Sequence, residues 1–266
     1  MEHNILSVHD LHFSYSKGKE VLHGFDYSFS DGKVTALLGA NGCGKSTLLH
    51  LLNGIYTPTQ GSVMLDGTPI REIGRKDFAR TVATVYQTNI APPDMTVRQL
   101  VQAGRTPYRS LCRPGNRQAD RAAVECAMHD TQIEALAQTA ISALSGGQLQ
   151  RVWLAMALAQ QTQILLLDEV TTYLDIHYQL EIMHLIRKLN REKGITVIAV
   201  LHDVNLALGF CDEAVVMQKG NLLASGDVRE TVRGEVLDRA FDVRTHILYE
   251  DDRPYCLFHR KEEDAP

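Results

Sequence analysis

The sequence predicts an α/β fold, because a short buried strand followed by a loop and a helix occurs three times along the chain. First, the apolar run VTALLG leads through a glycine-rich turn into a helix that starts near Lys45. Second, ILLLD from Ile164 to Asp168 precedes a helical stretch from Tyr178 to Lys193. Third, ITVIAVLH from Ile195 to His202 precedes a helix that begins near Val204. Parallel strands joined in this way form an open sheet, and ligands gather at the carboxyl ends of its strands.

Other segments add to this core. The first thirty residues alternate apolar and polar in ILSVHDLHFSY and VLHGFDYSFS, which predicts an antiparallel sheet. Between roughly Thr96 and Leu136, Ala-rich helical periodicity predicts an inserted helical subdomain, apart from a loop at Arg113 to Asn116. After Gly226, VRETVRGEVLDRAF predicts one amphipathic helix, and HILYEDDRPYCLFHR predicts a closing hairpin that turns around Asp252. The charged tail KEEDAP is expected to fray.

Composition is typical of a globular protein, with 266 residues, 44% hydrophobic and 22% charged. One large domain, or one with a subdomain, is expected. A net charge of -5 and the absence of a Lys or Arg run weigh against a dedicated nucleic-acid binder. The start MEHNILSVHD does not resemble a signal peptide and no long apolar run follows, so we expect the chain neither to span nor to cross a membrane. At a membrane it would dock onto another protein.

The cysteines are odd in number and widely scattered, with no close pair of the kind that forms zinc or redox sites. This pattern predicts a reducing cytoplasm. They are Cys43, Cys112, Cys126, Cys211 and Cys256.

The segment GANGCGKST matches the phosphate-binding pattern in which Gly, four residues and Gly precede Lys and Ser or Thr. Glycines let successive amide hydrogens point at the β-phosphate, and the following helix adds its positive end. Lys45 would neutralise the β- and γ-phosphates of ATP, and the Ser46 hydroxyl would bind Mg²⁺. A plain glycine turn does not explain the position of the match between an apolar strand and a helix. The candidate ATP-binding residues are Gly39, Ala40, Asn41, Gly42, Cys43, Gly44, Lys45, Ser46 and Thr47.

A pair of carboxylates, Asp168 and Glu169, ends the apolar run ILLL. A strand this hydrophobic is buried, so its terminal carboxylates emerge at the carboxyl edge of the sheet. Asp168 would hold Mg²⁺, through water, and Glu169 would act as the general base for the water that attacks the γ-phosphate. The alternative, a surface acidic pair at a turn, fits poorly with the buried strand that precedes it.

A second glycine-rich helix start, LSGGQLQR from Leu144 to Arg151, precedes the helical run VWLAMALAQ. Ser145 is a candidate N-cap, and Gly146 and Gly147 leave the first amides of the helix exposed, which makes a second anion site. Taken alone, SGG favours a helix start of purely structural use.

The motifs GANGCGKST, Gln87, LSGGQLQR, ILLLDE, YLD and His202 occur in the order seen in ATP-binding cassette (ABC) proteins, which the chain resembles over nearly its whole length. The resemblance implies the P-loop NTPase fold of an ABC nucleotide-binding domain, with an antiparallel β subdomain and an inserted helical subdomain. It also implies a homodimer with two ATP molecules at its interface. The residues that would complete the ATP site of the other subunit are Ser145, Gly146, Gly147 and Gln148.

The same resemblance assigns roles to single residues. Tyr15 matches the aromatic residue that stacks on adenine, with an ordinary half-buried strand tyrosine as the alternative. Gln87 matches the glutamine that contacts Mg²⁺ and the attacking water, and His202 matches the histidine that hydrogen-bonds the γ-phosphate. Asp175 matches the aspartate that links the two active sites across the dimer, with a helix-capping acid as the alternative. The catalytic set is therefore Glu169, His202 and Gln87, and the metal set is Ser46, Gln87 and Asp168.

One position departs from the family pattern, which usually has proline after the catalytic glutamate. Here Val170 follows Glu169 in ILLLDEVTTYLDI. Proline restricts the backbone but supplies no proton or ligand, so valine leaves the chemical groups intact. We expect looser positioning of Glu169, with ATP binding kept and turnover reduced.

The resemblance further implies one ABC domain over residues 1–266. Residues 1–90 and 160–226 would form the RecA-like core with the β subdomain, 91–159 the helical subdomain, and 227–266 a C-terminal helix and hairpin. TTYLDIHYQLEIM, LHDVNLAL and TVRQLVQAGRTPY most resemble the importer ATPases that serve iron-siderophore, haem and cobalamin uptake. The expected partners are membrane permease subunits, which dock near Thr88 to Tyr108, and, indirectly, an extracytoplasmic substrate-binding protein. The expected place is the cytoplasmic face of the cell membrane.

Two alternatives stay open at this point. A soluble ABC ATPase that acts on DNA or ribosomes resembles this chain in motif order, but such proteins carry long coiled coils or two cassettes, and neither is present here. A nucleotide-gated module with weak hydrolysis is suggested by Val170 alone.

Overall fold

The computed structural model describes residues 4–15, 18–109, 116–251 and 253–261. These residues form two compact units. Unit 1 comprises Met1–Ile70 and Ile198–Pro266, and unit 2 comprises Arg71–Val197. The domain divisions expected after residues 90, 159 and 226 differ from these limits and stay predictions. Of the residues named in these predictions, Cys112, residues 113–115 of the predicted loop, Asp252 and residues 262–266 of the tail lie outside the described residues.

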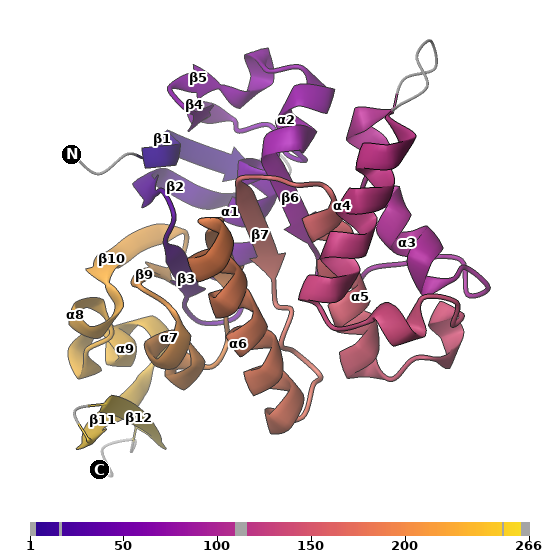
Figure 1. Ribbon diagram of the computed structural model, residues 1–266. Helices are drawn as coiled ribbons and strands as arrows, with labels where there is room; N and C mark the ends of the chain where they lie inside the picture. Colours follow the sequence, from indigo (N-terminus) through magenta and orange to yellow (C-terminus); the bar gives the residue numbers. More distant parts are fainter. Residues whose placement is uncertain (1–3, 16–17, 110–115, 252, 262–266) are drawn as a thin grey trace, which may run out of the picture. The chain divides into compact units, whose positions relative to one another are not determined.

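Unit 1 carries an antiparallel sheet, a phosphate-loop region and the C-terminal elements (Figure 1). Its strands and helices begin and end as follows: β1 Asn4–Ser14, β2 Glu20–Ser30, β3 Val34–Leu38, α1 Lys45–Leu52, β4 Gln60–Leu65, β5 Thr68–Pro69, α7 Val204–Phe210, β9 Glu213–Gln218, β10 Asn221–Asp227, α8 Val228–Thr231, α9 Gly234–Phe241, β11 Val243–Glu250 and β12 Arg253–Arg260. The short 3₁₀ helix η1 Ile70–Glu72 and the strand β8 Thr196–Val200 lie at the limits of the two units.

The predicted antiparallel sheet is present, with the strand order β2-β1-β4-β5. Leu6 of β1 pairs with Phe29 of β2 and with Leu65 of β4, and all three side chains are buried. Alternation of this kind places one face of each strand in the core. The alternation pattern of the first thirty residues does not single out β4 and β5, which complete the sheet.

The strand that leads into the phosphate loop, β3, is buried along its whole length. It pairs in parallel with β9, and β9 pairs in antiparallel fashion with β10. Because β3 is buried on both faces, its sequence VTALL is a continuous apolar run rather than an alternating one. Its carboxyl end is therefore held rigidly where the loop begins.

The segment after β10 corrects one prediction. VRETVRGEVLDRAF forms two helices, α8 and α9, instead of one. Arg233 between them is extended, with φ -114° and ψ 155°. The break lets both short helices turn apolar side chains inward, which one straight helix could not do. The predicted hairpin is present as β11 and β12, paired in register from Val243 opposite Arg260 to Glu250 opposite Arg253.

Unit 2 is mostly helical (Figure 1). Its elements begin and end as follows: α2 Arg75–Thr81, β6 Val82–Val85, α3 Val97–Ala103, η2 Thr106–Tyr108, α4 Arg117–Asp130, η3 Glu134–Leu136, η4 Ile141–Ala143, α5 Gly146–Ala159, β7 Ile164–Asp168 and α6 Ile176–Lys193. β6 and β7 pair in parallel, and Val85 lies opposite Leu167. The ends of these two strands therefore lie side by side.

The predicted helical subdomain consists chiefly of α3, α4 and α5, which pack on one another. Arg105 is buried at their meeting point, where its Nε lies 2.8 Å from Asp120 Oδ1 of α4. The Arg105 guanidinium also donates to the carbonyl of Ala159 at 2.8 Å. One side chain therefore ties the loop after α3 to α4 and to the end of α5.

Among the described residues, none of the helices combines the length and the apolar character that a membrane span requires. None of the four described cysteines, Cys43, Cys126, Cys211 and Cys256, forms a disulfide bond.

Candidate functional site

The phosphate loop follows the carboxyl end of β3 in unit 1. Gly39, Gly42 and Gly44 have φ values of 143°, 76° and 111°, in the region that favours glycine. A Cβ on Gly39 would lie only 2.3 Å from the carbonyl oxygen of Met217. Helix α1 begins at Lys45 after an N-cap, Gly44, that provides no side-chain hydrogen bond. The amino end of α1 therefore lies at the loop, where the motif predicts an anion.

Lys45 is buried inside this loop, 5% exposed. Its Nζ donates to the carbonyl oxygens of Gly39 at 2.7 Å and Ala40 at 3.1 Å. The Sγ of Cys43 lies 4.0 Å from the same Nζ. Burial raises the pKa of the Cys43 thiol, and the charge on Lys45 opposes this shift. A cation is thus held at the centre of the glycine turn, where phosphate oxygens would bind.

Tyr15 lies beside the phosphate loop helix, although it follows the first strand. Its hydroxyl is 2.8 Å from Thr47 Oγ1 in α1. The ring packs edge-on against Phe13 and Tyr56, and 60% of the residue is exposed. An anchored hydroxyl and an exposed ring fit the predicted stacking role, because the ring offers an apolar surface to a planar base.

His202 is exposed and follows the third strand of the sequence pattern. The amide of Leu201 donates to the carbonyl of Leu37 in β3 at 3.2 Å. The chain that precedes His202 therefore runs beside the end of the strand that leads into the phosphate loop. Within unit 1, the structure thus brings Tyr15, the loop and the segment before His202 to one region.

The acidic pair and Gln87 meet in unit 2. Asp168 ends β7 and is 6% exposed, and Glu169 follows it with a φ of 54°. Gln87 lies two residues past the end of the neighbouring strand β6. Its Nε2 donates to Glu169 Oε2 at 2.6 Å. The parallel pairing of β6 and β7 explains this contact between residues 82 positions apart.

Tyr86 lies next to this group. Burial raises the pKa of the Tyr86 hydroxyl, and the Asp168 carboxylate raises it further, although a hydrogen bond with Thr84 lowers it. Tyr86 therefore stays protonated in the physiological range, and the negative charge at this strand end belongs to the carboxylates.

The segment that begins the second glycine-rich helix is capped as predicted. Gln148 N donates to Ser145 Oγ at 3.3 Å, and Ser145 N donates to Gln148 Oε1 at 3.0 Å, which is a capping box. Ser145 and Gly146 are exposed, whereas Gly147 is buried. The Ser145 hydroxyl accepts the Gln148 amide and keeps its own hydrogen for an external acceptor.

Asp175 caps helix α6. Its Oδ1 accepts the amide of Tyr178 at 3.0 Å, and the residue is exposed. The helix-capping role considered in the sequence is thus observed. The linking role across a dimer stays a prediction.

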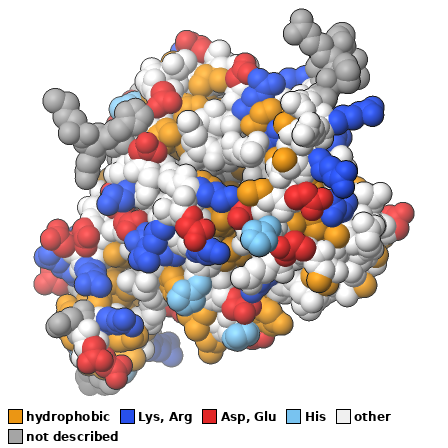
Figure 2. Space-filling model, viewed as in Figure 1, with side chains coloured by type: hydrophobic (Ala, Val, Ile, Leu, Met, Phe, Trp, Pro, Cys, Tyr) orange, Lys and Arg blue, Asp and Glu red, His pale blue; other side chains and the backbone are white. Residues whose placement is uncertain are grey.

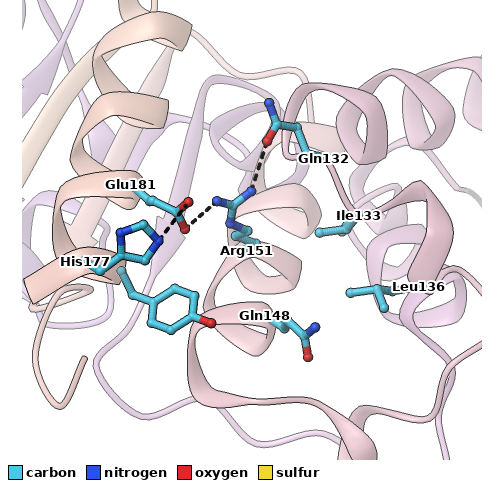
Figure 3. A pocket seen from close by; sticks show the side chains of 8 residues that line it. Gln132, Ile133, Leu136, Gln148, Arg151, His177 and Glu181 are labelled. Atoms are coloured by element: carbon cyan, nitrogen blue, oxygen red, sulfur yellow. Dashed lines mark hydrogen bonds and ion pairs between the residues drawn. The ribbon is translucent and has the colours of Figure 1, made fainter. Parts of the chain in front are cut away.

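A hollow of about 390 Å³ lies beside the capped start of α5 (Figure 3). Arg151 and Glu181 point toward each other across it, and Arg151 NH2 lies 2.8 Å from Glu181 Oε2. Tyr178 also lines it. The sequence motifs contain no signal for Tyr178 or Glu181, because their contacts join two helices that are far apart in the chain.

Comparison with known proteins identifies the family. The ABC transporter family model matches residues 22–172. The ferric enterobactin transport ATP-binding protein FepC of Escherichia coli is 44% identical over 218 residues, covering 82% of this chain and 80% of FepC. The iron(3+)-hydroxamate import ATP-binding protein FhuC of Bacillus subtilis is 40% identical over 256 residues, covering 96% of this chain and 94% of FhuC.

Solved structures of other ABC proteins have a similar fold. The structure of a metal-chelate-type ABC transporter in an inward-facing conformation matches with a TM-score of 0.83 and 26% identity, covering 98% of this chain and 99% of that one. A dimeric ATP-binding cassette bound to ADP and phosphate matches with a TM-score of 0.73 and 27% identity, covering 84% and 99%. With the phosphate loop, the acidic pair and the capped glycine helix in place, this chain belongs to the ABC transporter family, as the ATP-binding and ATP-hydrolysing subunit of an importer.

Proposed function

We propose that this ATPase energises the uptake of an iron chelate, such as a siderophore or haem, or of a related metal complex such as cobalamin. Its relatives support the substrate class, because FepC and FhuC are named for ferric enterobactin and iron(3+)-hydroxamate. A cobalamin import ATP-binding protein, BtuD of Halobacterium salinarum, is also 37% identical over 86% of this chain. The substrate itself would pass through a separate permease.

The main observation in support of ATP hydrolysis is the contact between Gln87 and Glu169. Glu169 would take a proton from the water that attacks the γ-phosphate, and Gln87, 2.6 Å away, would hold both the carboxylate and that water. Lys45 would bind the phosphates from inside the loop, and His202 would hydrogen-bond the γ-phosphate. Tyr15 would support the adenine. These groups supply positioning and charge, which is most of what phosphoryl transfer requires.

Mg²⁺ is the proposed metal, and when bound with ATP it would neutralise charge on the β- and γ-phosphates. Among the described residues, no cluster of three or more His, Cys, Asp or Glu side chains forms a metal site of its own. This suits a magnesium ion that takes most of its ligands from phosphate and water. The buried Asp168 carboxylate and the Gln87 amide oxygen are suitable oxygen ligands in unit 2. The Ser46 hydroxyl is assigned to the metal by the family resemblance.

We infer that the working unit is a homodimer in which Ser145, Gly146, Gly147 and Gln148 complete the ATP site of the other subunit. The exposed Ser145 hydroxyl and the position of Gly146 and Gly147 in the first turn of α5 support this role. A related cassette with 27% identity is described as a dimer with ADP and phosphate bound. Asp175 would link the two sites.

The permease would dock on the surface from Thr88 to Tyr108, at the cytoplasmic face of the membrane. Ile90 in this stretch is 91% exposed, which is unusual for a large apolar side chain and favours a protein contact. ATP-driven closure of the dimer would favour one conformation of the permease, because coupling requires different affinities for two states. A substrate-binding protein outside the membrane would take part indirectly, and no nucleic acid is involved.

Phosphate release separates this function from a nucleotide-gated module. Glu169→Gln is expected to lower the rate by about 10²-fold or more, because it removes a general base. Glu192→Gln, an exposed glutamate at the far end of α6, is the matched control and should retain the wild-type rate. Equal rates for wild type and Glu169→Gln would refute the catalytic role.

Transport tests the substrate class. The chain should copurify with an untagged permease, and uptake of radiolabelled ferric siderophore by the reconstituted complex should require ATP and an intact Glu169. Copurification with DNA-processing or ribosomal proteins, without a permease, would favour the soluble ABC ATPase instead.

A further inference from the structure

The first turns of α5 and α6 meet at the signature segment, which we define as Ser145 to Gln148. A Cβ added to Gly147 would lie 2.5 Å from Cδ1 and 2.8 Å from Cγ of Tyr178. A Cβ added to Gly146 would meet nothing nearer than Leu174 at 3.9 Å. The ring of Tyr178 therefore lies directly against the backbone of Gly147, and only glycine allows this approach. The hydroxyl is not part of the contact.

Tyr178 also contacts the other candidate interface residue of unit 2. Its amide donates to Asp175 Oδ1 at 3.0 Å, so that it belongs to the capped first turn of α6. One residue thus touches the signature segment through its ring and Asp175 through its backbone. Ser145 of the signature segment and Asp175 are both exposed on unit 2.

A second contact between α5 and α6, an ion pair, lies one turn further along both helices. Arg151 NH2 lies 2.8 Å from Glu181 Oε2, and the two side chains are 17% and 34% exposed. The other nitrogen of Arg151, NH1, lies 3.3 Å from Gln132 Oε1, and His177 lies 3.4 Å from Glu181 Oε1 (Figure 3). Partial burial leaves this ion pair less screened by salt than one on an open surface.

We propose that Tyr178 is a positioning residue that holds the signature segment in register with Asp175, and that the Arg151–Glu181 pair fixes the same register. This inference rests on the proposed dimer, in which both elements act on the partner subunit. The two helix starts then approach the partner as one rigid body. A displacement of the signature segment would change hydrolysis in the partner's site, while the phosphate loop of the same chain would keep its own affinity for MgATP.

Tyr178→Ala should therefore lower kcat about tenfold or more, because small misplacements of a positioning group are costly. The affinity of the isolated chain for MgATP should stay within about twofold of the wild type, since its own loop is unchanged. Tyr178→Phe keeps the ring and should restore the rate. Glu181→Gln should show a smaller loss of kcat, and Glu192→Gln should show none. A purely structural role would instead lower the melting temperature and reduce binding and rate together.

The decisive experiment mixes two variants that each have a strongly reduced rate as homodimers. Glu169→Gln has an intact signature segment, and Tyr178→Ala has an intact Glu169. In the heterodimer, the phosphate loop and Glu169 of the Tyr178→Ala chain face the unchanged signature segment of the other chain. With random pairing, half of the dimers are heterodimers, and each heterodimer has one complete ATP site and one defective site. The mixture should therefore recover about a quarter of the wild-type rate. Glu169→Gln mixed with Ser145→Arg is the control for the dimer arrangement itself.

The outcomes distinguish the two hypotheses. Rescue in both mixtures supports the positioning role of Tyr178 in trans. Rescue with Ser145→Arg but not with Tyr178→Ala overturns that role and leaves the dimer intact. Failure of both mixtures overturns the proposed dimer arrangement. Tyr178→Ala that binds MgATP and melts within a few degrees of the wild type, yet retains the full rate, also refutes the proposal.

Discussion

Among the single residues of the candidate site, Glu169 has a constrained backbone. Its φ of 54° places it in the left-handed region, which non-glycine residues occupy at a cost. The turn that follows is held by the amide of Thr172, which donates to the carbonyl of Glu169 at 3.0 Å. Val170 is buried behind it, 5% exposed. Packing and one local hydrogen bond therefore maintain a backbone conformation that aims the carboxylate at Gln87.

Replacing Val170 tests whether this turn limits turnover. Val170→Pro is expected to raise the rate of phosphate release or leave it unchanged, because proline stiffens the backbone and leaves the Glu169 carboxylate in place. MgATP affinity should stay the same. A severe loss of rate in a protein that still melts cooperatively would contradict this expectation.

Cys43 reports on occupancy of the phosphate loop. Its thiol is buried beside Lys45, and MgATP should protect it from maleimide. Burial raises the pKa of this thiol, so the reactive thiolate forms only as the pH rises above the usual range. Labelling without nucleotide should therefore accelerate at alkaline pH. Mass spectrometry of labelled peptides is the measurement.

The exposed Cys126 provides the internal control for that experiment. Its labelling should be the same with and without MgATP, since it lies in α4 of unit 2. Equal labelling of Cys43 in both conditions would refute the assignment of the loop.

Among the helices of unit 2, two kinds of interaction stabilise the structure: caps at the helix ends and side-chain contacts between helices. α3 and α5 each begin with a capping box, and α6 has Asp175 as its N-cap and Gly194, in the left-handed conformation, as its C-cap. These signals act within one helix. Arg105 acts between helices, because it is buried and reaches Asp120 of α4 and the end of α5. Its guanidinium also lies 3.7 Å from the centre of the Tyr108 ring.

Asp120→Ala should destabilise the protein by about 3 kcal/mol, since it leaves the buried charge of Arg105 without its partner. The free energy of unfolding in urea is the measurement. Asp77→Ala is the control, because the Asp77 side chain is 71% exposed and pairs with Arg80 on the surface. That pair should be worth less than about 1 kcal/mol. Equal losses for the two variants would show that the Arg105 pair does not anchor these helices.

At the scale of the whole molecule, charge is unevenly distributed. Residues 71–121 contain ten Lys and Arg and four Asp and Glu, a net +6, although the chain as a whole has a net charge of -5. Figure 2 shows Lys and Arg side chains gathered over α2 and the first half of α4. The sequence has no continuous run of Lys or Arg, but the packing of separate segments brings basic side chains together into a basic surface.

This surface includes Arg75 and Lys76 and lies in the same unit as the proposed permease-docking stretch. Association with the permease should therefore weaken as salt rises from low to high concentration, since screening acts on exposed charges. Arg75→Glu with Lys76→Glu should lower the association rate, measured by surface-immobilised complex in detergent. Lys188→Glu, on the exposed face of α6, should have no such effect. An association rate that is independent of salt would contradict this prediction.

The local parts of this protein follow from patterns that are visible in its sequence. The apolar runs before Gly39 and Asp168 gave the buried strands, the loop glycines gave the phosphate turn, and Ser145 and Asp175 were recognisable as helix caps. These features depend on neighbours a few residues apart, so their patterns are visible in a linear chain. Motif order was enough to indicate the family, which the comparisons confirm.

Contacts between segments that are distant in the chain could not be predicted and are seen in the folded protein. Gln87 reaches Glu169 because β6 and β7 pair in parallel, and Tyr178 covers Gly147 because two helix starts meet. The break between α8 and α9 likewise follows from burial on both sides of Arg233, which overrides helical periodicity. Such contacts depend on close packing in three dimensions, and no spacing along the chain encodes them. The phosphate loop was therefore predictable from sequence, whereas the partners that orient the catalytic and signature residues were not.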